Sequence, residues 1–194
     1  MSAPTHGELR LGDARIAWTL AREPGERRGT GRALLRSLVG SDAEFFAVCA
    51  QCGGPHGPLR VRPGSTGSTG SEDPEPLVSV AYAGPLVVVG TAPRGATAFA
   101  LDAELDAPSR RRAVREAIGS DRVLDWTRIE AVLKARGTGL RGDFAATRIE
   151  AAEPDAACEW RSPALDGSPA LTGCDARLAL PDGLSAVLST ATSR

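Results

Sequence analysis

No stretch of the 194-residue chain is apolar over the roughly 20 residues that a bilayer-spanning helix needs. Residues 1–10 also lack the apolar core of a secretory signal, so we expect a cytoplasmic protein with no membrane partner. A strong charge of either sign is absent as well, because the formal net charge is −1 and the sequence pI is about 6.2. Binding to nucleic acid through bulk positive charge is therefore not expected.

Cysteine is scarce, and four residues are too few for the dense disulfide framework of a small secreted domain. Cys49 and Cys52 form a Cys-x-x-Cys pair before a Gly-Pro turn, which is half of a zinc-ligand pattern. Cys158 and Cys174 are not spaced as a second pair of this kind. The pattern fits either reduced thiols in a turn or a structural zinc site.

Lysine is almost missing, since Lys134 is the single lysine and arginine takes its place elsewhere. Arginine in such excess is what a GC-rich coding sequence produces, so it says little about function. One lysine among many arginines suggests a need for an ammonium group at that position. An ammonium is a point charge with rotatable donors, whereas a guanidinium is a planar fork.

Apolar residues make up 42% of the chain and charged residues 24%, as in ordinary globular proteins of one larger or two small domains. Alternation and helical spacing of the apolar residues indicate an α+β protein. Strands are predicted at 9–20 (with a break), 45–52, 59–62, 77–80, 85–90, 97–105, 178–180 and 184–188, and helices at 26–38, 108–118 and 126–136. Asp125 is the predicted N-cap of the last helix, and Gly137 its end. The Gly-, Ser- and Thr-rich stretch 63–76 predicts a flexible loop.

Two carboxylates share one face of the strand predicted at 97–105. Apolar residues alternate there with Asp102 and Glu104, so the two acids stand side by side. Neighbouring anions repel each other unless they are solvated, protonated or bridged by a cation. Two or three carboxylates that leave positions open for phosphate and water suit Mg²⁺. The alternative is an exposed strand face that carries two acids without a metal.

Glu130 and Lys134 lie four residues apart on the helix predicted at 126–136. In this order an acid and a lysine form a favourable i, i+4 ion pair, so a solvated salt bridge is the simpler interpretation. The functional alternative makes Glu130 a metal ligand or general base and lets Lys134 hold a phosphate.

The segment 126–140, WTRIEAVLKARGTGL, resembles the signature of 4'-phosphopantetheinyl transferases of the surfactin-synthetase-activating type. That signature is Trp-x-x-Lys-Glu-Ala, then Lys three residues on, then Gly-x-Gly-Leu. Upstream, 100–104 (ALDAE) resembles the family's Gly-hydrophobic-Asp-hydrophobic-Glu strand. The segments 28–36 (RGTGRALLR) and 52–57 (CGGPHG) are similar to segments of actinobacterial members. These matches follow the family's order along the chain, from about residue 26 to residue 140.

The resemblance implies a pseudo-twofold pair of α+β halves, 1–95 and 96–194, with coenzyme A and Mg²⁺ in the cleft between them. It implies transfer of the phosphopantetheine arm of coenzyme A to a serine of an acyl or peptidyl carrier protein in secondary-metabolite biosynthesis. By position, the metal ligands would be Asp102, Glu104 and Glu130. Glu130 would also be the catalytic base, and Lys134 would stabilise the phosphates.

The residues that would bind coenzyme A by this resemblance are Arg28, Arg32, Ser79 and Tyr82. The two arginines would meet a 3'-phosphate, and Ser79 and Tyr82 lie where the family has a Ser-His-Ser strand end. The chain departs from the pattern at Tyr82, which replaces the histidine, and at Ile129, which replaces the lysine before the helix glutamate.

These departures leave three functions open. The chain is an active transferase, a different natural-product enzyme on the same fold, or a non-catalytic module that binds carrier proteins or coenzyme A. In the second case Tyr82 would be a candidate acid or base.

Overall fold

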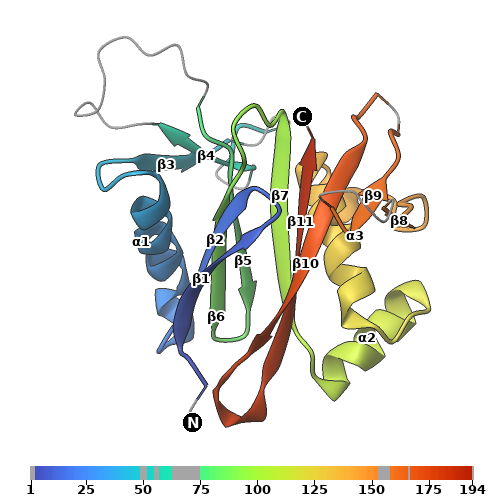
Figure 1. Cartoon of the computed structure of the whole chain (residues 1–194), viewed down its shortest axis with the longest axis horizontal. Helices are drawn as coiled ribbons and strands as arrows, with labels where there is room; N and C mark the ends of the chain where they lie inside the picture. Colours follow the sequence, from blue (N-terminus) through green and yellow to red (C-terminus); the bar gives the residue numbers. More distant parts are fainter. Residues whose placement is uncertain are drawn as a thin grey trace.

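Two antiparallel sheets form the centre of the molecule in the computed structural model, which describes residues 3–48, 52–54, 57–62, 75–152, 158–165 and 167–193 (Figure 1). The first sheet has the strand order β1-β2-β6-β5, and the second has the order β7-β11-β10-β9-β8. A separate two-stranded ladder joins β3 to β4. The structure is therefore a mixed α and β fold, consistent with the predicted α+β class.

The first sheet and its helix are built from the N-terminal part of the chain. The elements there are β1 (His6–Leu11), β2 (Ala14–Leu20), the 3-10 turn η1 (Pro24–Glu26), α1 (Arg27–Val39), β3 (Glu44–Ala47), β4 (Leu59–Arg62), β5 (Val78–Ala83) and β6 (Leu86–Thr91). The remaining elements are β7 (Ala98–Leu105), α2 (Pro108–Ile118), α3 (Val123–Ala135), η2 (Gly139–Arg141), β8 (Glu150–Ala151), β9 (Trp160–Ser162), β10 (Leu171–Ala179), η3 (Pro181–Gly183) and β11 (Ser185–Ser193). The two large sheets thus share no strand, and the chain passes from one to the other between Thr91 and Ala98.

The same connectivity occurs in both large sheets. In the first, β2 leads through α1 to the β5–β6 hairpin, and β6 pairs between β2 and β5. In the second, β7 leads through α2 and α3 to the β10–β11 hairpin, and β11 pairs between β7 and β10. The order of a strand, a helical segment and a hairpin therefore appears twice along the chain. In both cases the last strand of the hairpin pairs between the first strand and the other strand of the hairpin.

The sheets pack against each other, and helices cover their outer faces, with α1 on one side of the molecule and α2 and α3 on the other (Figure 1). Apolar side chains from both sheets fill the space between them, Leu86, Val88, Leu101 and Leu188 among them. The layer under α1 contains Leu35 together with valines of β5 and β6. Burial of apolar area at about 25 cal/mol per Å² is the main stabilising contribution to such layers.

The sheets also meet where β5 lies beside β7. The N–H of Leu101 on β7 donates to the hydroxyl of Ser79 on β5 at 3.0 Å, and both residues are buried. Gly90 of β6 permits close packing here, because a Cβ at that position would lie 2.7 Å from side-chain atoms of Ile16 and of Leu101. This contact fixes β7, which carries two of the predicted metal ligands, against the first sheet.

Several predicted elements are confirmed, including the strand at 59–62, the helix at 108–118 and the hairpin around η3. The N-cap prediction is wrong, because α3 begins at Val123 and Arg122 takes the cap position. Asp125 lies in the first turn instead and accepts the Ser120 hydroxyl at 2.7 Å.

Two sequence predictions concern residues outside the described ranges. Cys49 of the Cys-x-x-Cys pair and the segment 63–74 of the predicted loop lie there. In the part of the chain that is described, no helix combines the length and the apolar character needed to cross a membrane.

Candidate functional site

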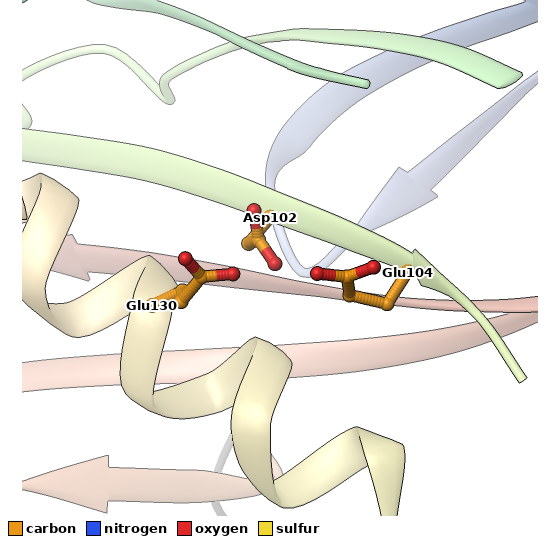
Figure 2. A group of neighbouring side chains, drawn as sticks. All are labelled: Asp102, Glu104 and Glu130. Atoms are coloured by element: carbon orange, nitrogen blue, oxygen red, sulfur yellow. The ribbon is translucent and has the colours of Figure 1, made fainter. Parts of the chain in front are cut away.

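Three carboxylates converge between β7 and α3, as Figure 2 shows. Asp102 and Glu104 point from β7 toward the helix, and Glu130 points from α3 toward the strand. One oxygen of each carboxylate lies within 4.8 Å of those of the other two. The alternation on β7 explains the arrangement, because the neighbouring residues Leu101 and Ala103 enter the core between the sheets.

The helix that carries Glu130 is held on the second sheet by a polar network. Arg128 of α3 donates through Nε to Asp175 of β10 at 2.9 Å. The same carboxylate accepts the indole N–H of Trp160 at 3.0 Å and the hydroxyl of Ser189 at 2.6 Å. Hydrogen bonds to a charged group are among the stronger ones in a protein, so this network fixes the position of α3 on the sheet.

Asp102 is the most buried of the three acids, with 3% of its surface exposed. Its Oδ1 accepts a hydrogen bond from Lys134 Nζ at 2.5 Å. Its Oδ2 is buried and, with Glu130 ionised, has no hydrogen-bond partner among the described residues, whereas a protonated Glu130 donates to Asp102. A buried carboxylate oxygen without a partner is costly, and a metal cation between the three acids would supply one.

Glu130 is 9% exposed, and its pKa is raised to about 7. Burial is the largest cause, the charge of Asp102 raises the pKa further, and the charge of Lys134 partly opposes both. Without a bound cation, Glu130 therefore holds its proton to a higher pH than an ordinary glutamate does. A cation beside the carboxylate would favour its charged form.

Glu104 forms an ion pair with Arg110, which projects from the first turn of α2. The guanidinium of Arg110 also lies over the ring of Trp126, 5.5 Å from its centroid. Trp126 precedes Glu130 by one helical turn on α3 and packs against Phe144. Arg110 and Trp126 thus lie beside the three acids. The sequence patterns did not predict the contact between this guanidinium and this ring.

The ligand set fits a divalent cation. When all groups are charged, the three carboxylates exceed the two cations Lys134 and Arg110 by one negative charge. All three acids offer hard oxygen atoms, which Mg²⁺ prefers over nitrogen or sulfur ligands. The buried, unpartnered Oδ2 of Asp102 adds a structural reason for a cation at this point.

The predicted coenzyme A residues fall into two places: Arg28 and Arg32 lie on α1, and Tyr82 of β5 packs against the same helix. The hydroxyl of Tyr82 lies over Gly31, where a Cβ would be 3.1 Å from it. Burial raises the pKa of Tyr82, and the charges of Arg28, Arg32 and Arg27 oppose this rise. Within the described ranges, neither Arg28 nor Arg32 forms an ion pair with a carboxylate. This arginine group, Arg27, Arg28 and Arg32 around Tyr82, is therefore a local excess of positive charge.

Ser79, the fourth predicted residue, lies apart from the arginine group. It is 9% exposed, and its hydroxyl contacts the backbone of Leu101 at the junction of β5 and β7. Ser79 and Tyr82 are an odd number of residues apart on β5, so their side chains point to opposite faces.

The acids and the arginine group lie against different helices. Asp102 and Glu104 face α3, whereas Tyr82 rests on α1. Their strands β7 and β5 lie side by side, so the two groups flank one junction. No family model matches this chain, and no curated protein matches it significantly.

Proposed function

We propose that this chain is a Mg²⁺-dependent 4'-phosphopantetheinyl transferase, which moves the phosphopantetheine arm of coenzyme A to a serine of an acyl or peptidyl carrier protein. The observation that carries the proposal is the convergence of Asp102, Glu104 and Glu130 around a buried, unpartnered oxygen. The two segments that resemble the family signatures, 100–104 and 126–140, are far apart in sequence, yet their acids meet in space.

The repeated connectivity supports the fold that goes with this function. The order β2-α1-β5-β6 recurs as β7-α3-β10-β11 with the same strand pairing. A pseudo-twofold pair of halves, 1–95 and 96–194, accounts for this repetition. Coenzyme A would then lie at the junction of β5 and β7, with the arginine group on one side and the acids on the other.

The metal would be held by Asp102, Glu104 and Glu130. Bound there, Mg²⁺ would neutralise charge on the diphosphate of coenzyme A, which is the main requirement of phosphoryl-transfer catalysis. Lys134 would add a second positive charge from α3. Its ammonium has three donors and uses one on Asp102, so others are available to phosphate oxygens.

The chain's own residues account for the proton in the transfer. Glu130 takes the proton of the carrier serine as the serine oxygen forms its bond to the phosphorus that carries the pantetheine arm. The bond from that phosphorus to the bridging oxygen breaks, and adenosine 3',5'-bisphosphate leaves with the electron pair. With Mg²⁺ bound, the cation would favour the charged carboxylate of Glu130, which is the form that accepts a proton.

The arginine group would bind the 3'-phosphate of coenzyme A. Arg28 and Arg32 have no carboxylate to neutralise them within the described structure, and Tyr82 adds a hydroxyl donor between them. Burial raises the pKa of Tyr82, so the side chain stays neutral at physiological pH and its hydroxyl would donate to the phosphate. This protonation state disfavours Tyr82 as the base of a different enzyme and leaves its role as an acid in that alternative open.

A calorimetric titration with coenzyme A, with and without Mg²⁺, tests the proposal. We expect binding that depends on Mg²⁺ and that weakens about 100-fold or more in the double variant Arg28→Ala/Arg32→Ala, because two hydrogen bonds between charged groups are lost. Arg112→Ala is the matched control, since Arg112 is exposed on α2. Metal-independent binding would favour a non-catalytic coenzyme A module, and no binding at all would favour a different enzyme on this fold.

A further inference from the structure

We infer that Arg110 regulates the metal centre by competing with the divalent cation for Glu104. When the cation binds, the guanidinium of Arg110 turns from Glu104 toward the diphosphate of the substrate. The inference rests on the proposed function, because it needs the three acids to be a cation site. It concerns a residue that lies outside both signature segments, 100–104 and 126–140.

The first observation is the ion pair itself. Among the contacts of the described residues, Glu104 is the one member of the acid group with an ion-pair partner from α2, and only 16% of its side chain is exposed. The Arg110 side chain is 33% exposed, so its guanidinium is more accessible to solvent than the carboxylate it pairs with. Arg110 occupies Oε1 of Glu104, so a cation that enters the group competes with the guanidinium for the charge of this carboxylate. Metal binding and this ion pair are therefore linked, and each weakens the other.

The second observation is that Arg110 retains unused hydrogen-bonding capacity. Its Nε is buried and has no partner in the described part of the structure. Its guanidinium lies over the Trp126 ring, a contact that holds a cation in place without using its N–H donors. Release from Glu104 would leave a guanidinium with its N–H groups unpaired beside the acids, on a rigid aromatic surface.

The third observation is the shortage of other cations at this point. Lys134 donates one of its N–H groups to Asp102 and is the cation that α3 contributes, whereas Ile129 of α3 is apolar and 8% exposed and supplies no charge. Besides Lys134, Arg110 is the basic side chain that pairs with an acid of the group in the described structure. A guanidinium matches phosphate in a bidentate manner, so Arg110 supplies the phosphate contact that an apolar Ile129 does not.

The test uses Arg110→Gln with Arg112→Gln as its matched control on the same helix. Binding of Mn²⁺ alone is measured by calorimetry, and binding of inorganic pyrophosphate is measured with pyrophosphate added as its Mg²⁺ complex. Arg110→Gln should bind Mn²⁺ about three- to tenfold more tightly, because a partly buried ion pair no longer competes. The same variant should bind Mg²⁺-pyrophosphate about tenfold more weakly, because a charged hydrogen-bond donor is lost. Arg112→Gln should change neither affinity by more than about twofold.

The opposite signs of the two effects separate this role from a structural one, since a damaged site would bind both ligands more weakly. Thermal melting of each variant checks the fold. If Arg110→Gln does not fold, Arg110→Lys takes its place, because it keeps a positive charge without the planar guanidinium. The same two affinities are then measured, with smaller effects of the same signs expected. Unchanged Mn²⁺ affinity in the Arg110 variants would overturn the inference while leaving the metal centre intact. Failure of the unaltered protein to bind Mn²⁺ would overturn both the inference and the proposed function.

Discussion

Lys134 of α3 donates to Asp102 of β7 at 2.5 Å, although the nearest acid to Lys134 in the sequence is Glu130 on the same helix. The solvated i, i+4 salt bridge between Glu130 and Lys134 is therefore the wrong interpretation: the lysine connects the helix to the strand. Glu130 is left buried with a pKa raised to about 7. The single lysine of the chain thus lies at the acid group, where its ammonium offsets one of three carboxylates.

Asp102→Asn should weaken Mn²⁺ binding about 100-fold. The substitution keeps the shape of the side chain but removes the charge and one of the two carboxylate oxygens, which hard cations need. Calorimetric titration with Mn²⁺ measures the effect. Asp121→Asn is the control, because Asp121 is exposed and pairs only with Arg115 in the described structure. Equal Mn²⁺ affinity in the two variants would remove Asp102 from the cation site.

The metal-free protein should lose stability as the pH rises toward and through 7. The pKa of Glu130 is raised from 4.5 to about 7 in the folded protein, so the folded state binds the proton more tightly than the unfolded state does. This contribution is fully present below pH 4.5 and is lost as the pH rises through the folded-state pKa. It amounts to about 3 kcal/mol, at 1.36 kcal/mol for each pKa unit. Urea unfolding in the presence of a chelator at pH 5 and pH 8 measures it.

Glu130→Gln is the control for this pH effect, because glutamine is similar in shape and does not titrate. The variant should show a smaller loss of unfolding free energy between the two pH values than the unaltered protein. Mg²⁺ should restore stability to the unaltered protein at pH 8, since the cation favours the charged carboxylate. Parallel pH dependence in the two proteins would show that Glu130 has an ordinary pKa.

Ser79→Ala should lower the unfolding free energy by about 1–3 kcal/mol, because the buried Leu101 N–H loses its acceptor. Ser37→Ala is the control: its hydroxyl is exposed and donates to the Leu34 carbonyl within α1, so the change should be about 0.5 kcal/mol or less. Coenzyme A affinity, measured on the same variants, shows whether Ser79 has a second role. A Ser79 variant as stable as the unaltered protein would mean that the junction of β5 and β7 does not depend on this hydroxyl.

The sequence predicts those parts of the site that lie within one element. Alternation along the strand at 97–105 places Asp102 and Glu104 on one face, and the structure confirms this. The N-cap at Asp125 is predicted wrongly, because capping preference competes with a hydrogen bond from Ser120 that depends on the preceding turn.

Patterns within one element do not predict the contacts between elements. The pairing of Lys134 with Asp102 depends on how α3 lies on β7, which the network around Asp175 fixes. Arg110 follows Glu104 by six residues, but a strand, a turn and a helix start lie between them, so neither a period of 2 nor one of 3.6 relates them. The turn that directs α2 back over the acids decides this contact.

The most direct test of the proposed function is to incubate the protein with coenzyme A, Mg²⁺ and a panel of apo carrier proteins, and to measure the intact mass of each carrier. We predict that at least one carrier gains the mass of one phosphopantetheine arm. The gain should disappear on chelation and in Glu130→Gln, whose folded state is checked by its melting curve. No gain on any carrier, together with no calorimetric binding of coenzyme A, would contradict the transferase function. A gain that Glu130→Gln retains would exclude Glu130 as the base.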